Sequence, residues 1–220
     1  MPPFLSREDY FTAWSQWHGG TDPRASGVVR GWLTIAHTLA RPLAGVPPLA
    51  VTLLGLAVAG AAVGPAAAGG PWLVLAGVLV GLSGLLDSLD GALAIAGGRA
   101  GRRGFVLDSA VDRLTEVAYA LAFWAAGAPA WLAVAFGALC WFPDYLRARA
   151  GQAGVDETGA ISVWERPTRV AMAGMTLGGA GVVSGVGLAE LVVTAGAAVG
   201  VALGVVGTAQ LGVQLRRALG

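Results

Sequence analysis

The sequence predicts an all-α integral membrane protein in which six transmembrane helices follow N-terminal amphipathic juxtamembrane helices. Three observations lead to this fold class. Of the 220 residues 55% are hydrophobic and 12% are charged, six long apolar runs recur along the chain, and arginines occupy alternate turns between those runs. Because charged residues make up about 25% of an average soluble domain, the chain is too apolar for that class. We expect an interfacial segment at 1–46 and one membrane domain at 47–220.

The first 46 residues interleave aromatic with charged side chains instead of forming an apolar run. Trp14, Trp17 and Trp32, for example, stand among arginines and acids. Helices of this composition lie in the headgroup layer of a bilayer, although a small soluble cap packed on the membrane domain would have a similar composition. The chain does not begin with a basic stretch followed by an apolar one, so we expect no cleavable signal peptide.

The six apolar runs are mostly close to the ~20 residues that a helix needs to cross a bilayer. They cover about 49–68, 71–96, 104–127, 129–143, 170–186 and 190–213. The fourth run is short, so its helix is expected to continue into the polar interval that follows. Closely spaced glycines, such as Gly77 with Gly81 and Gly200 with Gly204, are expected where helices touch.

The arginines predict the orientation of these helices. All 14 basic residues are arginine, and all but one lie in the N-terminal segment, the 97–103 turn, the 144–169 interval or the C-terminal tail. The turns near 65–70, 126–130 and 187–189 have none. By the positive-inside rule, both termini lie in the cytosol of a protein in the plasma membrane. The remaining arginine, Arg113, is expected to pair with Glu116 or with a nearby acid.

Other residues exclude several classes of protein. The formal net charge of +1 provides no basic field for nucleic acid. Cys140 is the single cysteine, so neither an internal disulfide nor a cysteine-based metal site is expected. His18 and His37 are distant in sequence from the acidic residues of the apolar runs, and we expect both to serve packing or interfacial roles.

Four carboxylates inside the apolar sequence form the candidate functional site. Asp87 and Asp90 are three residues apart, and Asp108 and Asp112 are four apart, spacings that place each pair on one helix face. The Gly/Arg-rich turn between them predicts an antiparallel helix pair, so the two acidic faces can meet near its cytosolic end. Mutual neutralisation by arginines at the helix ends is the alternative explanation for these acids.

An oxygen-only site of this kind suits Mg²⁺ or Mn²⁺. Two divalent cations would neutralise four carboxylates, and paired ions can clamp the attacking and leaving oxygens of a phosphoryl transfer. Gly91 and Gly104 would let a nucleotide or phosphate approach the backbone closely. The predicted substrate therefore carries a diphosphate.

These residues resemble the signature of the CDP-alcohol phosphotransferases, also called CDP-alcohol phosphatidyltransferases. That signature is D-x2-D-G-x2-A-R-x8-G-x3-D-x3-D. The sequence here reads Asp87-x2-Asp90-Gly91-x2-Ala94-Ile95-x8-Gly104-x3-Asp108-x3-Asp112. The predicted six helices and the preceding amphipathic segment extend the resemblance over nearly the whole chain.

The resemblance implies a phospholipid-synthesising transferase with a two-metal site at Asp87, Asp90, Asp108 and Asp112. Asp112 would also be the general base that takes the proton of an acceptor hydroxyl. That hydroxyl would attack the phosphorus attached to the lipid alcohol of CDP-diacylglycerol or a related CDP-alcohol, and CMP would leave. The donor nucleotide would lie near Asp87, Gly91 and Gly104, and also near Thr52 of the first span.

One position departs from the signature: Ile95 replaces an arginine expected near the diphosphate. Arg99, one helical turn further on, is our candidate substitute. The alternative is a weakened or inactive family relative that binds lipid or nucleotide as an accessory membrane protein. A divalent-cation transporter is disfavoured, because its acids would line a pathway near the midplane of the membrane.

The polar interval resembles that of the phosphatidylinositol phosphate synthase branch of the family. Arg147 and Arg166 stand where the branch is expected to grip the phosphate of its acceptor, a polar alcohol or a sugar-alcohol phosphate. Asp144 replaces a serine expected beside that phosphate, and its carboxylate is expected to repel the ligand. Family members often dimerise, so the resemblance also raises a homodimer.

Overall fold

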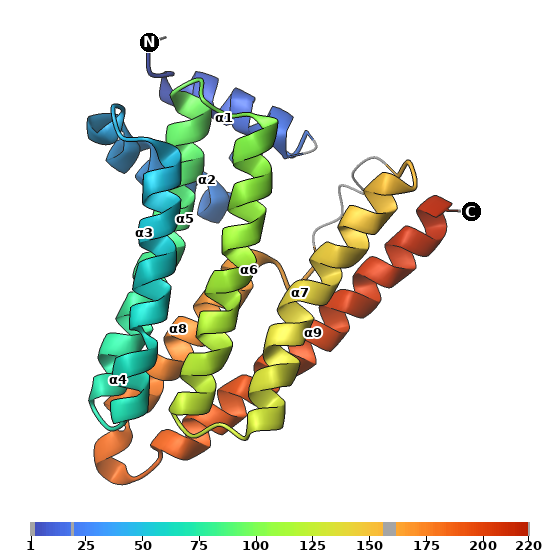
Figure 1. Cartoon of the computed structure of the whole chain (residues 1–220). Helices are drawn as coiled ribbons and strands as arrows, with labels where there is room; N and C mark the ends of the chain where they lie inside the picture. Colours follow the sequence, from blue (N-terminus) through green and yellow to red (C-terminus); the bar gives the residue numbers. More distant parts are fainter. Residues whose placement is uncertain (1–2, 19, 156–161, 220) are drawn as a thin grey trace. The chain divides into compact units, whose positions relative to one another are not determined.

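The computed structural model describes residues 3–18, 20–155 and 162–219, and within these ranges the chain is helical without any strand (Figure 1). The α-helices are α1 (Arg7–Trp17), α2 (Gly27–Ala40), α3 (Pro48–Ala61), α4 (Val63–Ala68), α5 (Trp72–Ala96), α6 (Arg102–Ala125), α7 (Ala130–Gln152), α8 (Arg166–Val182) and α9 (Ala189–Leu219). Three short 3₁₀ helices, η1 (Pro23–Ala25), η2 (Arg41–Leu43) and η3 (Ser184–Val186), lie between them. The predicted all-α class is therefore confirmed.

Three segments of the described chain are long and apolar enough to cross a membrane. They are Pro48–Ala68, Trp72–Ala96 and Ala189–Leu219. Helix α6 carries several ionisable residues in its first half, and α8 has 17 residues. Six transmembrane helices therefore stay a prediction. Helix α7 continues to Gln152, as expected from the short fourth apolar run.

The chain forms two compact units, each built from separate stretches of sequence. Unit 1 combines residues 1–56 with 83–112, and unit 2 combines 57–82 with 113–220. All four motif aspartates belong to unit 1, whereas the arginines of the polar interval belong to unit 2. The predicted division into an interfacial segment and a membrane domain stays a prediction.

In unit 1 the N-terminal helices pack on the C-terminal half of α5. Tyr10 from α1 and Leu33 from α2 share one apolar cluster with Leu93 of α5, and burial raises the pKa of the Tyr10 phenol. The backbone N–H of Leu5 donates to the carbonyl of Ala96 over 2.9 Å. Helices α1 and α2 are thus anchored to α5, while their position in the headgroup layer stays a prediction.

His37 is part of this N-terminal packing. Its ring stacks on Tyr10 with 5.2 Å between centroids, and its Nε2 lies 2.9 Å from the carbonyl oxygen of Leu5. The side chain is buried. His37 therefore has the packing role that the sequence predicted.

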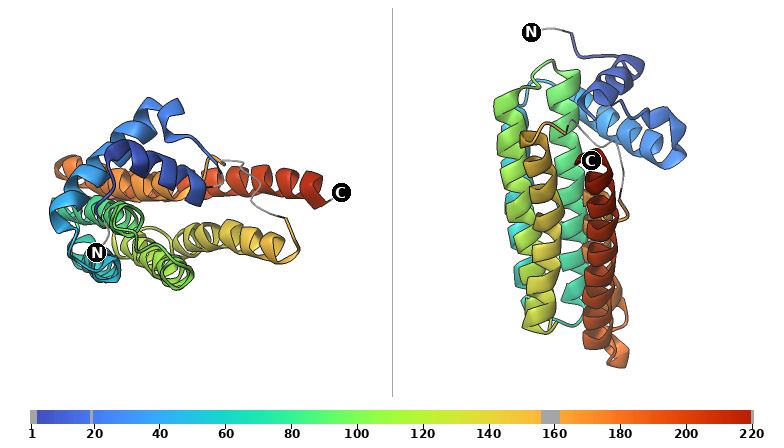
Figure 2. Two further views of the ribbon diagram at one scale, coloured as in Figure 1. Left: turned by 90° about the horizontal axis from the view of Figure 1, so that it is seen from above. Right: turned by 90° about the vertical axis from the view of Figure 1, so that its right-hand side faces the viewer.

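In unit 2, α9 packs along both α7 and α8 (Figure 2). Glycines of α9 make this close approach possible, because a β-carbon at Gly200 would lie 2.7 Å from Cε2 of Phe136 on α7, and one at Gly196 would clash with the side chain of Thr176 on α8. Three of the four glycines expected at contacts, Gly77, Gly200 and Gly204, have neighbours this close. A β-carbon at Gly81 would meet nothing within 4 Å, but one at Gly174 of α8 would lie 3.7 Å from the backbone nitrogen of Gly81, so Gly81 also lies at a helix contact.

Candidate functional site

A short turn places the acidic residues of α5 and α6 side by side. Five residues separate Ala96, at the end of α5, from Arg102, at the start of α6. Gly98 adopts φ 64°, a left-handed conformation that favours glycine, and the backbone N–H of Arg99 bonds back to the carbonyl of Ala94 over 2.8 Å. The chain therefore reverses at once, and the acidic faces of the two helices can meet within unit 1.

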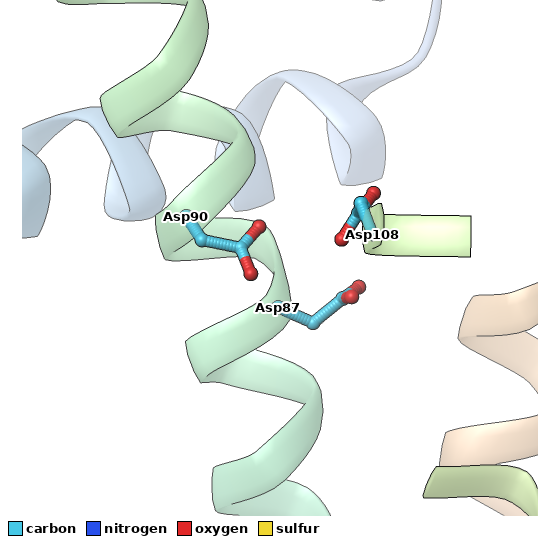
Figure 3. Close-up of side chains that lie close together, drawn as sticks. All are labelled: Asp87, Asp90 and Asp108. Carbon is cyan, nitrogen blue, oxygen red and sulfur yellow. The ribbon is translucent and has the colours of Figure 1, made fainter. Parts of the chain in front are cut away.

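Three of the four motif aspartates come together in this hairpin. Asp87 and Asp90 project from α5 toward Asp108 on α6 (Figure 3). One carboxylate oxygen from each residue lies within 4.8 Å of the other two. Asp90 is 4% exposed, and the other two are half-buried. Carboxylates this close cannot all ionise cheaply unless a cation offsets their charge.

The donor set fits a hard divalent cation. Mg²⁺ binds oxygen ligands at about 2.0–2.1 Å, so oxygens on opposite sides of one ion lie about 4.2 Å apart. The spread of the three carboxylate oxygens accommodates that geometry. Mn²⁺ favours the same ligands, and no nitrogen or sulfur ligand belongs to the three-residue group. Asp87, Asp90 and Asp108 could therefore hold the predicted ion.

Asp112 is set apart from this group. It lies on α6 one turn beyond Asp108 and is half-buried. Among the described residues, the carboxylate oxygens that lie within 4.8 Å of one another come from Asp87, Asp90 and Asp108, and neither oxygen of Asp112 is among them. Its predicted roles as fourth metal ligand and general base stay predictions.

Unit 2 contains a second charged cluster, centred on Asp144 of α7. Oδ1 of Asp144 accepts from Arg147 at 3.1 Å, and Oδ2 accepts from Arg169 of α8 at 2.7 Å and from Arg113 of α6. Asp144 thus has three guanidinium partners, of which Arg113 and Arg169 also pair with Glu116, and Arg147 also pairs with Glu165. The predicted repulsion of a phosphate by Asp144 stays a prediction.

Beneath Asp144 the cluster is fully buried. Arg169 donates to Glu116 over 2.8 Å, and the side chains of both residues are 1% exposed. Nε of Arg113 lies 2.9 Å from the other oxygen of Glu116, which confirms the predicted i,i+3 pair. Because breaking a buried pair leaves an uncompensated charge, these contacts fix the positions of Arg113 and Arg169.

Toward the surface, Arg147 makes a two-pronged contact with Glu165, the residue that precedes α8. The distances are 2.6 Å from Nη2 to Oε1 and 3.2 Å from Nη1 to Oε2. Oε1 of Glu165 also accepts from the backbone N–H and the hydroxyl of Ser162, both at 2.8 Å. Nη2 of Arg166 lies 3.4 Å from the hydroxyl of Thr115.

Comparison with known proteins identifies the family of this two-unit chain. The sequence model of the CDP-alcohol phosphatidyltransferases matches residues 33–205. The chain belongs to the CDP-alcohol phosphatidyltransferase family. The resemblance predicted from the motif is thereby confirmed. The archaetidylinositol phosphate synthase of Pyrococcus horikoshii is 37% identical over 99 residues, which are 44% of this chain and 52% of that protein. The match thus spans about half the length of that relative.

Ile95 stands at the position where the motif of the CDP-alcohol phosphatidyltransferases has an arginine, so this chain has no guanidinium group there. Ile95 is half-buried and packs against the apolar cluster of unit 1. Arg99, its candidate substitute, instead donates to three carbonyls, those of Val46 at 2.8 Å, Ala44 at 3.0 Å and Leu93 at 3.4 Å. Arg99 therefore ties the end of α5 to the segment before α3, and its role toward a donor stays a prediction.

The glycines of the family motif stand in open space. Neither Gly91 nor Gly104 has a positive φ, and a β-carbon at either would meet nothing within 4 Å. Packing within the described chain thus gives no reason for glycine at either position, and their predicted place beside a donor stays a prediction. The hydroxyl of Thr52 donates to the carbonyl of Pro48 over 3.1 Å, a bond within its own helix.

Two charged residues of the cluster around Asp144 were not singled out by the sequence interpretation: Glu165 and Arg169. The sequence showed their charges, but their partners Arg147 and Glu116 lie 18 and 53 residues away along the chain. Only the i,i+3 pair of Arg113 with Glu116 was predicted. The remaining pairs depend on how α6, α7 and α8 pack.

Proposed function

We propose that the protein transfers a phosphatidyl group from CDP-diacylglycerol, or the equivalent group from a related CDP-alcohol, to the hydroxyl of a polar acceptor. CMP is the second product. The observation that supports this most directly is the meeting of three motif carboxylates, Asp87, Asp90 and Asp108, within 4.8 Å. Membership of the family gives the reaction class.

In this proposal Asp87, Asp90, Asp108 and Asp112 hold two divalent cations, Mg²⁺ or Mn²⁺. Such ions stabilise the charge that develops on a diphosphate during phosphoryl transfer. The carboxylates orient them and exclude ligands other than oxygen. The open space at Gly91 and Gly104 supports a donor that approaches beside these acids, with Thr52 at the start of the first span.

Asp112 is the proposed general base. Its carboxylate takes the proton of the acceptor hydroxyl as the hydroxyl oxygen bonds to the phosphorus next to the lipid alcohol. The bond between that phosphorus and the oxygen bridging to CMP breaks, and CMP leaves with the electron pair. Asp112 lies one turn beyond Asp108, and it can accept this proton without belonging to the group formed by the three other aspartates.

The proposed acceptor is a polar alcohol that carries a phosphate, such as a sugar-alcohol phosphate. Arg147 and Arg166 are its expected ligands, and the gathering of arginines around Asp144 in unit 2 supports an anionic ligand there. Guanidinium groups match phosphate in a two-pronged geometry. The name of the Pyrococcus relative points to an inositol phosphate product for that protein.

We further propose that the protein lies in the plasma membrane with both termini and the site in the cytosol. The distribution of arginines supports this orientation. A homodimer is a prediction from the family alone.

Release of CMP by the purified full-length protein tests the proposal. The protein is incubated with Mg²⁺, CDP-diacylglycerol and a panel of acceptors with and without phosphate. We expect CMP release that requires both the metal and an acceptor, and that Asp112→Asn abolishes. If no acceptor produces CMP, or if Asp112→Asn releases it at the wild-type rate, the enzyme proposal fails.

One observation favours the second candidate, a non-catalytic relative that binds lipid or nucleotide. Ile95 packs in the apolar core, and Arg99 is committed to backbone carbonyls. The donor diphosphate therefore lacks the cation that the motif usually supplies. CDP-diacylglycerol binding without CMP release would support this alternative.

A further inference from the structure

Arg147, the arginine proposed to bind the phosphate of the acceptor, already contacts a carboxylate. Glu165 meets Arg147 through both of its oxygens, at 2.6 and 3.2 Å. Phosphate and carboxylate present the same fork of oxygens to a guanidinium group. A phosphate that binds Arg147 in that geometry must therefore replace Glu165.

The exposure of this pair permits such an exchange. The side chains of Arg147 and Glu165 are 29% and 28% exposed, whereas those of Arg169 and Glu116 are both 1% exposed. Water can reach the first pair and solvate either partner, but it cannot reach the second. Among the described contacts of the cluster, the one between Arg147 and Glu165 is therefore among those that can open at low cost.

Both partners keep other contacts when the pair opens. Arg147 retains its bond to Asp144, whose carboxylate is fixed by Arg113 and Arg169. Glu165 retains two donors on Ser162. The guanidinium group thus stays in place, and the displaced carboxylate stays hydrogen-bonded.

We propose that Glu165 is an exchangeable counter-ion of Arg147 that the acceptor's phosphate displaces, which makes Glu165 a specificity-determining residue. A neutral alcohol cannot compete with a carboxylate for a guanidinium group, whereas a phosphate can. Glu165 therefore lowers the affinity for acceptors that bind Arg147, and it admits to Arg147 only an acceptor whose anionic group can replace a carboxylate. This inference rests on the proposed assignment of Arg147 to the acceptor.

Inorganic phosphate is the probe that tests the exchange without turnover. Binding is measured by calorimetry on the purified full-length protein in EDTA, so that no cation at the acids of unit 1 can recruit phosphate. Glu165→Gln should bind phosphate about three- to tenfold more tightly than wild type, because one partly exposed competing charge is gone. Arg147→Gln should lose this binding, and the double variant should not regain it.

Two further variants separate charge removal from other effects. Glu190→Gln makes the same change at the start of α9 and should leave phosphate affinity unchanged. Ser162→Ala loosens Glu165 but keeps its charge, so it should not reproduce the gain. Equal or weaker phosphate binding by a folded Glu165→Gln protein, or an equal gain in Ser162→Ala, overturns the inference.

Kinetics separate this inference from the proposed function. With a phosphorylated acceptor, Glu165→Gln should lower the KM for the acceptor and leave kcat and the KM for CDP-diacylglycerol unchanged. A protein that shows the expected phosphate affinities but never releases CMP would overturn the proposed function and retain the exchange. Normal CMP release with no effect of Glu165→Gln would overturn the exchange alone.

Discussion

At the scale of single residues, Asp90 has the most constrained environment of the grouped aspartates. It is 4% exposed, and its carboxylate shares a small volume with those of Asp87 and Asp108. Water solvates such a group poorly, so a bound cation would offset the cost of burying its charge. Removing this carboxylate should therefore weaken cation binding.

Asp90→Asn should therefore abolish the stabilisation by Mg²⁺ and lower CMP release by about 100-fold or more. Thermal unfolding with and without Mg²⁺ measures the first effect, because a ligand that binds the folded state raises the melting temperature. Asp9→Asn, an exposed position on α1, is the matched control and should keep the full response. An undiminished Mg²⁺ shift in Asp90→Asn would contradict the metal assignment.

Ile95, which stands in place of the motif arginine, is the second residue whose role in the proposed donor site can be tested. Ile95→Arg should lower the KM for CDP-diacylglycerol by about tenfold, because a cation near a diphosphate adds a charge-assisted contact. Initial rates of CMP release against donor concentration measure the change. Ile95→Gln, similar in length but uncharged, controls for lost packing against unit 1. If both variants have the wild-type KM, Ile95 lies away from the diphosphate.

At the scale of helices, contact between neighbours depends on particular glycines. A β-carbon at Gly181 of α8 would lie 2.4 Å from the backbone nitrogen of Val74, and a backbone atom cannot rotate away. Gly181→Ala should therefore destabilise the protein by about 1–3 kcal/mol. Gly179→Ala, two residues earlier with nothing within 4 Å, should be neutral or stabilising, since alanine favours helix.

Thermal unfolding of the two variants in the same detergent measures this difference. Gly181→Ala should melt below wild type and Gly179→Ala should not. Equal melting temperatures would mean that α8 can move away from α5 without loss of stability.

The sequence predicted helices better than it predicted contacts between them. Apolar runs and Gly-rich turns placed α5 through α9 within a few residues, because one helix is specified by its own residues. The spacing of Asp87, Asp90 and Asp108 likewise predicted their meeting, since a short turn joins their helices. The partners of Asp144 could not be predicted, because they depend on the rotation and depth of three packed helices. Asp112 was expected with the other acids from its spacing and from the family signature, and its place beside them stays a prediction.

At the scale of the whole molecule, the arrangement across the membrane stays open to a direct test. Single cysteines are placed at or near the ends of helices, in a Cys140→Ala background that removes the one native cysteine. Ala68→Cys and Gly185→Cys should react with an impermeant maleimide on intact cells. Gly151→Cys and Arg217→Cys should react only after permeabilisation.

Labelling of all four positions with and without permeabilisation provides the measurement, and the unsubstituted Cys140→Ala background is the control. Reaction of Gly151→Cys on intact cells would exclude the alternation of six spans. It would also place the arginine cluster at the wrong face for a cytosolic acceptor.

The two charged clusters differ in the order in which their members are synthesised. The grouped aspartates all lie within 87–108, a single hairpin of α5 and α6. Arg169, by contrast, is separated from Glu116 by 53 residues and from Asp144 by 25. The ribosome thus completes the three grouped aspartates before α7 begins, whereas the contacts of Glu116 and Asp144 with Arg169 wait for α8. Loop closure over such separations is slower than closure of a hairpin, so until α8 inserts these two carboxylates have, among their described partners, only Arg113 and Arg147 to neutralise them.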